Sequence, residues 1–302
     1  MYDILIVGGG TAGLTAAIYA RRAGKTVLVL EGTGFGGQIT SSPLVENYPG
    51  MKAVSGLDYS EALTQQAQDL GAETKFGQVQ AVRREEDRFV LTAGKKEYEG
   101  KALILATGAK HRHLGVEGEE AMTGRGVSYC AVCDGAFFKD KETAVVGGGD
   151  SALQSAIFLS GICKKVTLIH RRDQFRGQDA DVQVVKSREN IELALNSQVT
   201  ALHGEPLLTG VTLTNKDGTT RELSIAGLFV AVGQEPDNQV FADLVDLDEA
   251  GYIVAGEDCL TKTSGVFTAG DCRTKTLRQL TTAAADGSVA ATAACRFVDG
   301  QA

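Results

Sequence analysis

The sequence lacks any long uninterrupted run of apolar residues. No apolar stretch approaches the roughly 18 residues of a membrane-spanning helix, so we expect no membrane association. Basic charge is also scarce, since 30 Lys and Arg face 38 Asp and Glu and give a formal net charge of -8. This balance argues against a nucleic-acid partner held through phosphate contacts. The N-terminus has neither the basic nor the apolar region of a signal peptide, which predicts a cytoplasmic protein.

Histidine and cysteine are also few. The chain has four His and six Cys, and a single pair, Cys130 and Cys133, has C-x-x-C spacing. In a reducing compartment such a pair is catalytic or metal-binding more often than structural. Half a zinc site, a static disulfide and a cycling redox pair are the three interpretations. At 302 residues and 43% hydrophobic composition, the chain is long and apolar enough for two soluble domains.

A dinucleotide-binding pattern opens the chain. The stretch YDILIVGGGTAG runs from an apolar strand into Gly8-x-Gly10-x-x-Gly13, and an amphipathic helix follows and ends at Gly24. The glycines let the backbone approach a pyrophosphate, which the amides and the positive end of the helix then hold. A second strand ends at Glu31, 21 residues after Gly10, where a carboxylate would accept hydrogen bonds from a ribose.

The same pattern returns in the middle of the chain, but it ends differently. Gly147-x-Gly149-x-x-Ala152 opens a helix, and the next strand ends at His170, again 21 residues after the second glycine. Three arginines follow at once: Arg171, Arg172 and Arg176. A carboxylate suits the unmodified ribose of FAD or NAD, whereas clustered guanidiniums suit the 2'-phosphate of NADP, although they could simply be a solvated surface.

The two copies continue alike. Each has an antiparallel sheet insertion, expected within 82–100 and 211–225, and a late strand, expected within 102–109 and 227–236. Near the C-terminus GVFTAGD predicts a short strand ending at Asp271, followed by a long Ala-rich helix. If this piece belongs with the first copy, the first domain is discontinuous. The predicted fold is therefore α/β, with two Rossmann-like dinucleotide-binding domains: residues 1–112 with 243–302, and an inserted domain at 113–242.

These motifs together resemble the low-molecular-weight thioredoxin reductases, which are FAD-containing, NADPH-dependent disulfide reductases. The resemblance covers the whole chain and rests on the order of the motifs: Gly8 to Gly13, GGQI (36–39), VENYPG (45–50), ATGA (106–109), CAVCDG (130–135), GGGDSA (147–152), HRRDQFR (170–176), AGD (269–271) and LRQ (277–279). It implies a homodimer. It also implies FAD contacts from Gly8, Gly10, Gly13, Glu31, Gln38, Asn47, Asp271, Arg278 and Gln279, and NADPH contacts from Gly149, Ser151, Arg171, Arg172 and Arg176.

The resemblance implies a role for the cysteine pair as well. NADPH would reduce FAD, which would reduce the Cys130–Cys133 disulfide, and the dithiol would reduce a thioredoxin or thioredoxin-like protein. Cys133 would face the flavin, Cys130 would attack the partner disulfide, and Asp134 would protonate the leaving thiolate. Because the nicotinamide and the disulfide need the same flavin, the inserted domain would rotate about linkers at 111–119 and 234–238.

Competing interpretations of these residues remain. A zinc site would need more ligands, but no second C-x-x-C occurs among Cys163, Cys259, Cys272 and Cys295, which fit better as core residues. A static disulfide is disfavoured by the reducing compartment and by the short loop between the two cysteines. Asp134 could cap a helix. His111-x-His113 could bind metal but fits a solvent-exposed linker. The alternative functions are a related flavoprotein disulfide reductase or dithiol oxidase that uses ferredoxin as donor or a different redoxin or small molecule as acceptor, and a redox-inactive flavin-binding protein.

Overall fold

The computed structural model describes residues 1–42 and 44–300. The chain divides into two compact units, and each is described by itself. Unit 1 consists of Met1–Lys110 and Glu235–Ala302, and unit 2 consists of His111–Gln234. Unit 2 is therefore inserted into a discontinuous unit 1, which confirms the predicted fold class.

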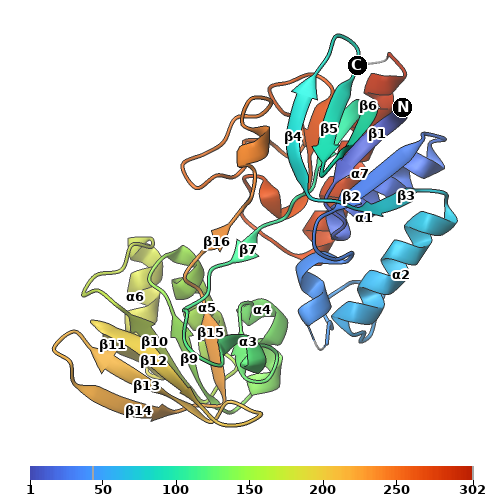
Figure 1. Cartoon of the computed structure of the whole chain (residues 1–302). Coiled ribbons are helices and arrows are strands. Elements are labelled where there is room, and N and C mark those ends of the chain that lie inside the picture. The colour runs from blue at the N-terminus through green and yellow to red at the C-terminus, as the bar shows by residue number, and fades with distance from the viewer. Residues whose placement is uncertain (43, 301–302) are drawn as a thin grey trace. The chain divides into compact units, whose positions relative to one another are not determined.

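Unit 1 is built on a seven-stranded mixed sheet (Figure 1). Its strand order is β3-β2-β1-β6-β5-β4, and the C-terminal strand β17 pairs with β6. β3, β2, β1, β6 and β17 are parallel, whereas β4 and β5 run antiparallel beside β6. The strands are β1 (Tyr2–Val7), β2 (Val27–Glu31), β3 (Glu73–Phe76), β4 (Val79–Arg84), β5 (Phe89–Ala93), β6 (Lys96–Leu105) and β17 (Val266–Thr268).

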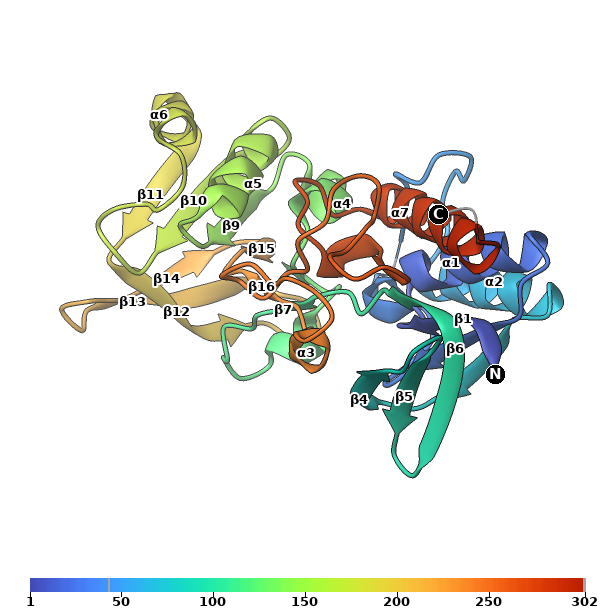
Figure 2. The same ribbon diagram turned by 90° about the horizontal axis from the view of Figure 1, so that it is seen from above.

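Both faces of this sheet are buried, which explains why its central strands are apolar throughout. Ile4 and Ile6 pack into one core cluster, and Leu5 and Val7 into another, as the alternation of side chains along a strand requires. On the first face lie α1 (Thr11–Arg22), α2 (Gly56–Asp69) and α7 (Leu280–Val298), with α1 between the other two (Figure 2). Buried side chains of this size each contribute roughly 1.5–3 kcal/mol.

Unit 2 repeats the plan with a five-stranded parallel sheet in the order β11-β10-β9-β15-β8. α5 packs against β9 and β10, and α6 against α5 (Figure 1). A separate antiparallel sheet, β12-β13-β14, supplies Val211 and Leu213 to the core on the other side. The elements are β8 (Val127–Ser128), β9 (Glu142–Val146), β10 (Lys165–His170), β11 (Ile191–Leu195), β12 (Ser197–His203), β13 (Gly210–Asn215), β14 (Thr220–Ser224), β15 (Gly227–Val230), α3 (Glu119–Met122), α4 (Ala131–Asp134), α5 (Asp150–Ser160) and α6 (Asp179–Ser187).

The chain passes between the units through two short strands, β7 (Lys110–His111) and β16 (Gln234–Glu235), which pair with each other. The two units divide after residues 110 and 234, and the sequence-based domain boundaries lie after residues 112 and 242. Residues 235–242 belong to unit 1 because Asn238 is buried there, where it donates to the carbonyls of Gly251 and Cys272. Within the predicted linker 234–238, Asn238 is thus held by hydrogen bonds to unit 1.

Two details of the strands differ from the sequence-based expectation. The late strand of the first copy is the second half of β6, so one continuous strand serves both the antiparallel insertion and the parallel core. In unit 2 the insertion has a third strand, β12, ahead of the predicted hairpin. Within the described residues, no helix has both the length and the apolarity to cross a membrane.

Candidate active site

The first glycine turn joins β1 to α1 and leaves room for an anion. A Cβ on Gly8, whose φ is +107°, would lie 2.1 Å from the carbonyl oxygen of Ala106, and one on Gly13 would lie 1.9 Å from that of Gly8. Both positions therefore need glycine. Gly10 differs, because the atom nearest its Cβ position is 3.9 Å away, and no side chain caps the helix that begins after it. An open surface at an uncapped helix N-terminus fits a pyrophosphate.

Glu31 lies at the end of β2 and braces this turn. One carboxylate oxygen accepts from the amide of Gly9 at 2.7 Å, and the other accepts from the amide and hydroxyl of Thr33 and the amide of Gly34, at 2.8, 3.0 and 3.2 Å. A carboxylate has about four acceptor sites. A ribose hydroxyl bound here would compete with the Thr33 hydroxyl, the one side-chain donor of this set.

Asp271 lies after β17, in a turn that packs on α1. Its Oδ1 atom is buried and has no hydrogen-bond partner within residues 1–42 and 44–300. Burial raises the pKa of Asp271, and the positive charges of Lys275 and Arg278 oppose that rise. A buried polar atom without a partner is costly, so this oxygen is a natural acceptor for a ligand hydroxyl. Gly270 in the same turn has φ +82°, and a Cβ added to it would lie 2.8 Å from the Ala12 methyl.

The other predicted FAD residues of unit 1 differ in the contacts that they make. Arg278 stacks on Tyr252, 4.2 Å from the ring centroid, and donates to backbone carbonyls, including that of Asp271 at 3.3 Å. These hydrogen bonds hold the turn that carries Asp271. Asn47 donates to the Gln279 side chain at 3.1 Å, and Gln279 also caps α7. Gln38 is exposed in a 3-10 turn beside Gly36, which pairs with Gly10.

The second glycine turn, between β9 and α5, repeats this arrangement. Gly147 has φ +154°, and its Cβ would lie 2.3 Å from the carbonyl oxygen of Ala231, whereas Gly149 has no atom within 4 Å of its Cβ position. Gly149 precedes α5 without a side-chain cap, and Ser151 is exposed in the first turn of that helix. The site again combines one glycine required by packing with one facing open space.

The arginine loop is tied to this turn. The amide of Arg176 donates to the carbonyl of Gly148 at 2.7 Å, so the loop after β10 lies against the turn. Arg171, Arg172 and Arg176 are exposed, and in the part of the chain that the structure describes none of them forms an ion pair. Exposed guanidiniums without carboxylate partners, in a loop that lies against a glycine turn, fit a phosphate.

Cys130 and Cys133 form a disulfide, with their Cα atoms 5.3 Å apart. Cys130 precedes α4, and the amide of Cys133 donates to its sulfur at 3.1 Å. Once the disulfide is reduced, this amide would stabilise negative charge on the Cys130 sulfur. Cys163, Cys259, Cys272 and Cys295 are buried free thiols, as predicted for core residues.

Asp134 ends the turn that carries both sulfurs. Its Oδ2 accepts from the Ser128 hydroxyl at 2.6 Å, while its Oδ1 is buried without a partner in the described chain. Burial raises the pKa of Asp134, and the hydrogen bond from Ser128 offsets part of that rise. Its side chain does not cap the 3-10 turn that follows, so the capping interpretation is not supported. A carboxyl with a raised pKa holds its proton more tightly than usual, which suits a general acid.

Sequence reasoning missed the contacts around Tyr129. Its hydroxyl donates to Glu119 at 2.8 Å and lies 2.8 Å from His113 Nδ1, while the ring of His111 stacks on it at 4.9 Å. Glu119 is 3% exposed and also accepts from the amides of Leu114 and Gly115. His113 is exposed, as expected for the linker, but burial and the charge of His113 lower the pKa of His111 to about 4. Nothing in the sequence around Glu119 indicated that its carboxylate would be buried.

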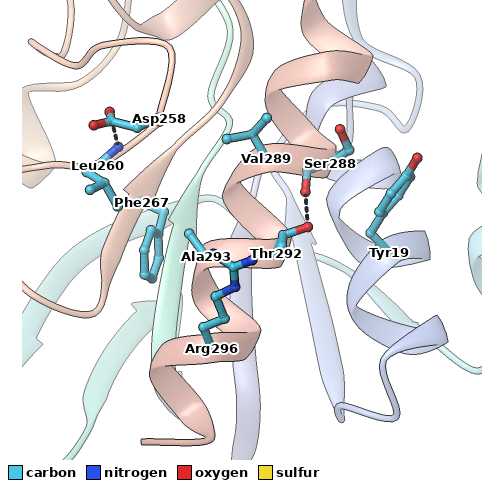
Figure 3. Close-up of a pocket in the computed structure, with 9 residues that line it drawn as sticks. All are labelled: Tyr19, Asp258, Leu260, Phe267, Ser288, Val289, Thr292, Ala293 and Arg296. Carbon is cyan, nitrogen blue, oxygen red and sulfur yellow. Dashed lines mark hydrogen bonds between the residues drawn. The ribbon is translucent and has the colours of Figure 1, made fainter. Parts of the chain in front are cut away.

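Unit 1 also has a hollow away from its glycine turn, between α1, α7 and the segment before β17 (Figure 3). Its volume is about 510 Å³. Tyr19 of α1 and Val289 of α7 face it from the helices, and Leu260 faces it from the loop. All three side chains are exposed.

A chain with two dinucleotide turns and a C-x-x-C disulfide in the second unit has the features of a nucleotide-dependent disulfide oxidoreductase. Residues 2–287 match the family described as pyridine nucleotide-disulphide oxidoreductase, and the chain belongs to this family. Similar proteins are the thioredoxin reductases of Listeria monocytogenes, 42% identical, and Bacillus subtilis, 41% identical; each alignment covers 99% of this chain and 94% or 95% of the relative.

Solved structures of thioredoxin reductases are also similar to this chain. Thioredoxin reductase from Streptococcus pyogenes is 39% identical with a TM-score of 0.95, and the enzyme from Giardia duodenalis is 39% identical with a TM-score of 0.94. Each match covers 99% of both chains. HlmI, at 22% identity and a TM-score of 0.86, shares the fold.

Proposed function

We propose that this chain is an NADPH-dependent thioredoxin-disulfide reductase and a flavoprotein. The observation that carries this is the Cys130–Cys133 disulfide, which lies in a unit with its own nucleotide turn and arginine loop. The relatives named above are thioredoxin reductases. When bound, FAD accepts a hydride from NADPH and delivers two electrons to the disulfide.

Unit 1 is the proposed FAD domain. The Gly8–Gly13 turn and the N-terminus of α1 would hold the pyrophosphate, and Glu31 would accept from a ribose. The unpartnered oxygen of Asp271 supports this assignment, because a ligand hydroxyl would satisfy it. Gln38, Asn47 and Gln279 are proposed to complete the site, while Arg278 would act by fixing the Asp271 turn.

Unit 2 is the proposed NADPH domain. Gly149 and Ser151 would receive the pyrophosphate at the N-terminus of α5, and Arg171, Arg172 and Arg176 would receive the 2'-phosphate. Supporting this, the Arg176 amide ties the arginine loop to the glycine turn. Replacing Arg171 and Arg176 by Ala should raise the KM for NADPH far more than that for NADH, and equal effects would contradict the 2'-phosphate assignment.

The resemblance to thioredoxin reductases supports the order of the thiol steps that we propose. After reduction, the Cys130 thiolate attacks the partner disulfide, forms a mixed disulfide and expels one partner thiolate. The Cys133 thiolate then attacks the Cys130 sulfur, restores the internal disulfide and expels the second partner thiolate. Asp134 gives its proton to a leaving thiolate and becomes a carboxylate, so the two electrons end on the partner's sulfurs.

Domain rotation is also part of the proposal. The nicotinamide and the disulfide both belong to unit 2, yet both must exchange electrons with a flavin carried by unit 1. Rotation about β7 and β16 would let them alternate. A chemical cross-link that joins the two units should therefore slow thioredoxin reduction strongly. Full activity in the cross-linked protein would exclude the rotation.

A homodimer and a cytoplasmic location complete the proposal. The 510 Å³ hollow is bordered by exposed Tyr19, Leu260 and Val289, which supports a second copy covering this face of unit 1 (Figure 3). Val289→Glu should convert the dimer to monomer in light scattering, whereas Val184→Glu, at an exposed apolar site of unit 2, should not. A dimer unaffected by Val289→Glu would place the interface elsewhere.

Anaerobic stopped-flow spectroscopy tests the central claim. NADPH should bleach the flavin of the loaded protein, and thioredoxin disulfide should reoxidise it. Cys130→Ser should retain the bleaching and lose thioredoxin reduction, which makes it a matched control for the first half of the reaction. Absence of bleaching by NADPH, with bleaching by reduced ferredoxin, would favour the alternative donor. Reduction of a small disulfide but of no thioredoxin would favour the alternative acceptor.

A further inference from the structure

Ser128 joins the backbone of the redox pair to the side chain of Asp134. Its Oγ accepts from the Cys130 amide at 3.1 Å and donates to Asp134 Oδ2 at 2.6 Å. Ser128 lies at the end of β8 and is 4% exposed, so water competes little for either contact. The serine thus connects the residue that attacks the partner disulfide with the residue that would supply the proton.

The hydroxyl of Ser128 has two acceptors available to it. Besides Asp134 Oδ2, the carbonyl oxygen of Cys130 lies 3.4 Å from Oγ. A serine hydroxyl rotates, donates one hydrogen bond and accepts two. When Asp134 is ionised, the hydroxyl donates to its carboxylate. When Asp134 carries a proton on Oδ2, the carboxyl donates to Ser128, and the hydroxyl can turn to the Cys130 carbonyl. The same side chain therefore fits both forms.

We propose that Ser128 is a positioning residue that sets the proton affinity of Asp134 beside the redox pair. The proposal rests on the proposed function, in which Asp134 is the acid. In that step the O–H bond of Asp134 breaks, an S–H bond forms on the leaving sulfur, and the carboxylate left behind receives the Ser128 hydrogen bond. No electrons move in the proton transfer itself. Without the serine, the new charge would be buried with no donor in place.

The test compares Ser128→Ala with Ser128→Thr in the FAD-loaded protein. Redox-induced infrared difference spectra report the protonation of Asp134 against pH, with Asp134→Asn identifying the carboxyl band. Single-turnover reduction of thioredoxin disulfide is measured over the same pH range. Loss of a hydrogen bond to the ionised form raises the pKa of a carboxyl, and an acid loses activity as pH rises through its pKa.

In Ser128→Ala both the infrared transition and the fall in rate should therefore move to higher pH, by about one pH unit. The plateau rate should drop, because a weaker acid gives up its proton more slowly. Ser128→Thr keeps the hydroxyl and should restore both. Ser128→Gly is a second variant without a hydroxyl, and FAD content checks that each variant folds.

An Asp134 transition at the same pH in wild type, Ser128→Ala and Ser128→Gly would overturn the proposal. So would a threonine variant that behaves like the alanine variant. The acid role of Asp134 is tested separately by Asp134→Asn. If that change left the rate of thioredoxin reduction intact while Ser128→Ala still moved the infrared transition, the acid step would fail and the coupling would stand.

Discussion

Asp286 should be the most costly single carboxylate to remove from unit 1. It is buried on α7 and accepts from the amide of Gly270 at 2.9 Å, from two nitrogens of Arg273 at 2.9 and 2.8 Å, and from Lys275 at 2.8 Å. The side chains of Arg273 and Lys275 are 1% and 4% exposed. Asp286→Ala would leave two buried cations and one amide without this acceptor.

Breaking a buried ion pair from one side costs about 3–5 kcal/mol. For a domain the size of unit 1, each kcal/mol lowers the Tm by about 2–4 °C, so the unfolding transition of Asp286→Ala should fall by roughly 6 °C or more. The surface pair of Asp246 and Lys262, at 2.9 Å, is the matched control. Asp246→Ala removes an exposed pair and should cost about 0.5 kcal/mol or less.

The pH dependence gives a second check. Burial alone would raise the pKa of Asp286, but the hydrogen bonds from Arg273 and Lys275 outweigh it and hold the pKa below its ordinary value. A lowered pKa in the folded state stabilises the protein above the unfolded pKa, and this contribution is lost as pH falls through the folded value. The gap in Tm between wild type and Asp286→Ala should be constant between pH 6 and 8 and shrink below about pH 4.

Circular dichroism and flavin fluorescence follow unfolding and FAD release in the same experiment. FAD should leave Asp286→Ala more readily, because the Gly270 amide that Asp286 holds precedes Asp271. A Tm within about 1 °C of wild type at pH 7 would refute the reasoning. It would mean that Arg273 and Lys275 find other acceptors at little cost.

Three further outcomes are expected. Gly147→Ala should destabilise unit 2 by about 2 kcal/mol or more, since the added Cβ would lie 2.3 Å from a carbonyl, whereas Gly149→Ala should leave the Tm unchanged and weaken NADPH binding in a fluorescence titration. Arg176→Lys should retain the loop, which is held by the backbone amide, yet lose selectivity for NADPH over NADH in KM. Tyr129→Phe should leave Glu119 short of a donor and lower the free energy of unfolding, measured by urea titration, by about 1 kcal/mol, whereas Phe158→Leu should leave it unchanged as an exposed control.

Local patterns predicted the parts of the fold that depend on neighbours in sequence. The turns at Gly8 and Gly147 follow from glycine spacing, because each must pass within contact distance of another backbone. The insertion of unit 2 followed from repeated strands. The exact points at which the chain passes from one unit to the other could not be predicted from local patterns. The burial of Asn238, for example, depends on acceptors at Gly251 and Cys272 that are distant in sequence. The continuity of β6 likewise reflects pairing with β1 and β5 at once.

The sequence offered candidate site residues one by one, but it did not indicate the hydrogen bonds among them. Spacing selected the Cys130–Cys133 pair and Asp134 is the next residue, yet nothing in the sequence indicated that Ser128 would bond Asp134 or that Tyr129 would bond Glu119. Such contacts join a strand end to a turn or a loop, and they depend on how the backbone folds back. Arg278 also donates to the backbone carbonyls of Asp271, Lys275 and Arg273, contacts that its predicted role as an FAD ligand did not indicate.

The two halves of the chain differ most at one equivalent position. In unit 1 the strand after the turn ends in Glu31, whose carboxylate accepts from the Gly9 amide. In unit 2 it ends in His170, which is 5% exposed and fills the space where a Cβ on Gly148 would lie, 2.2 Å from the ring. The Glu31 carboxylate would repel a 2'-phosphate, whereas burial and the charges of the adjacent arginines lower the pKa of His170 and so disfavour its charged form. The charge at the equivalent position therefore changes sign between the copies without a change of fold, which fits two dinucleotides of different charge.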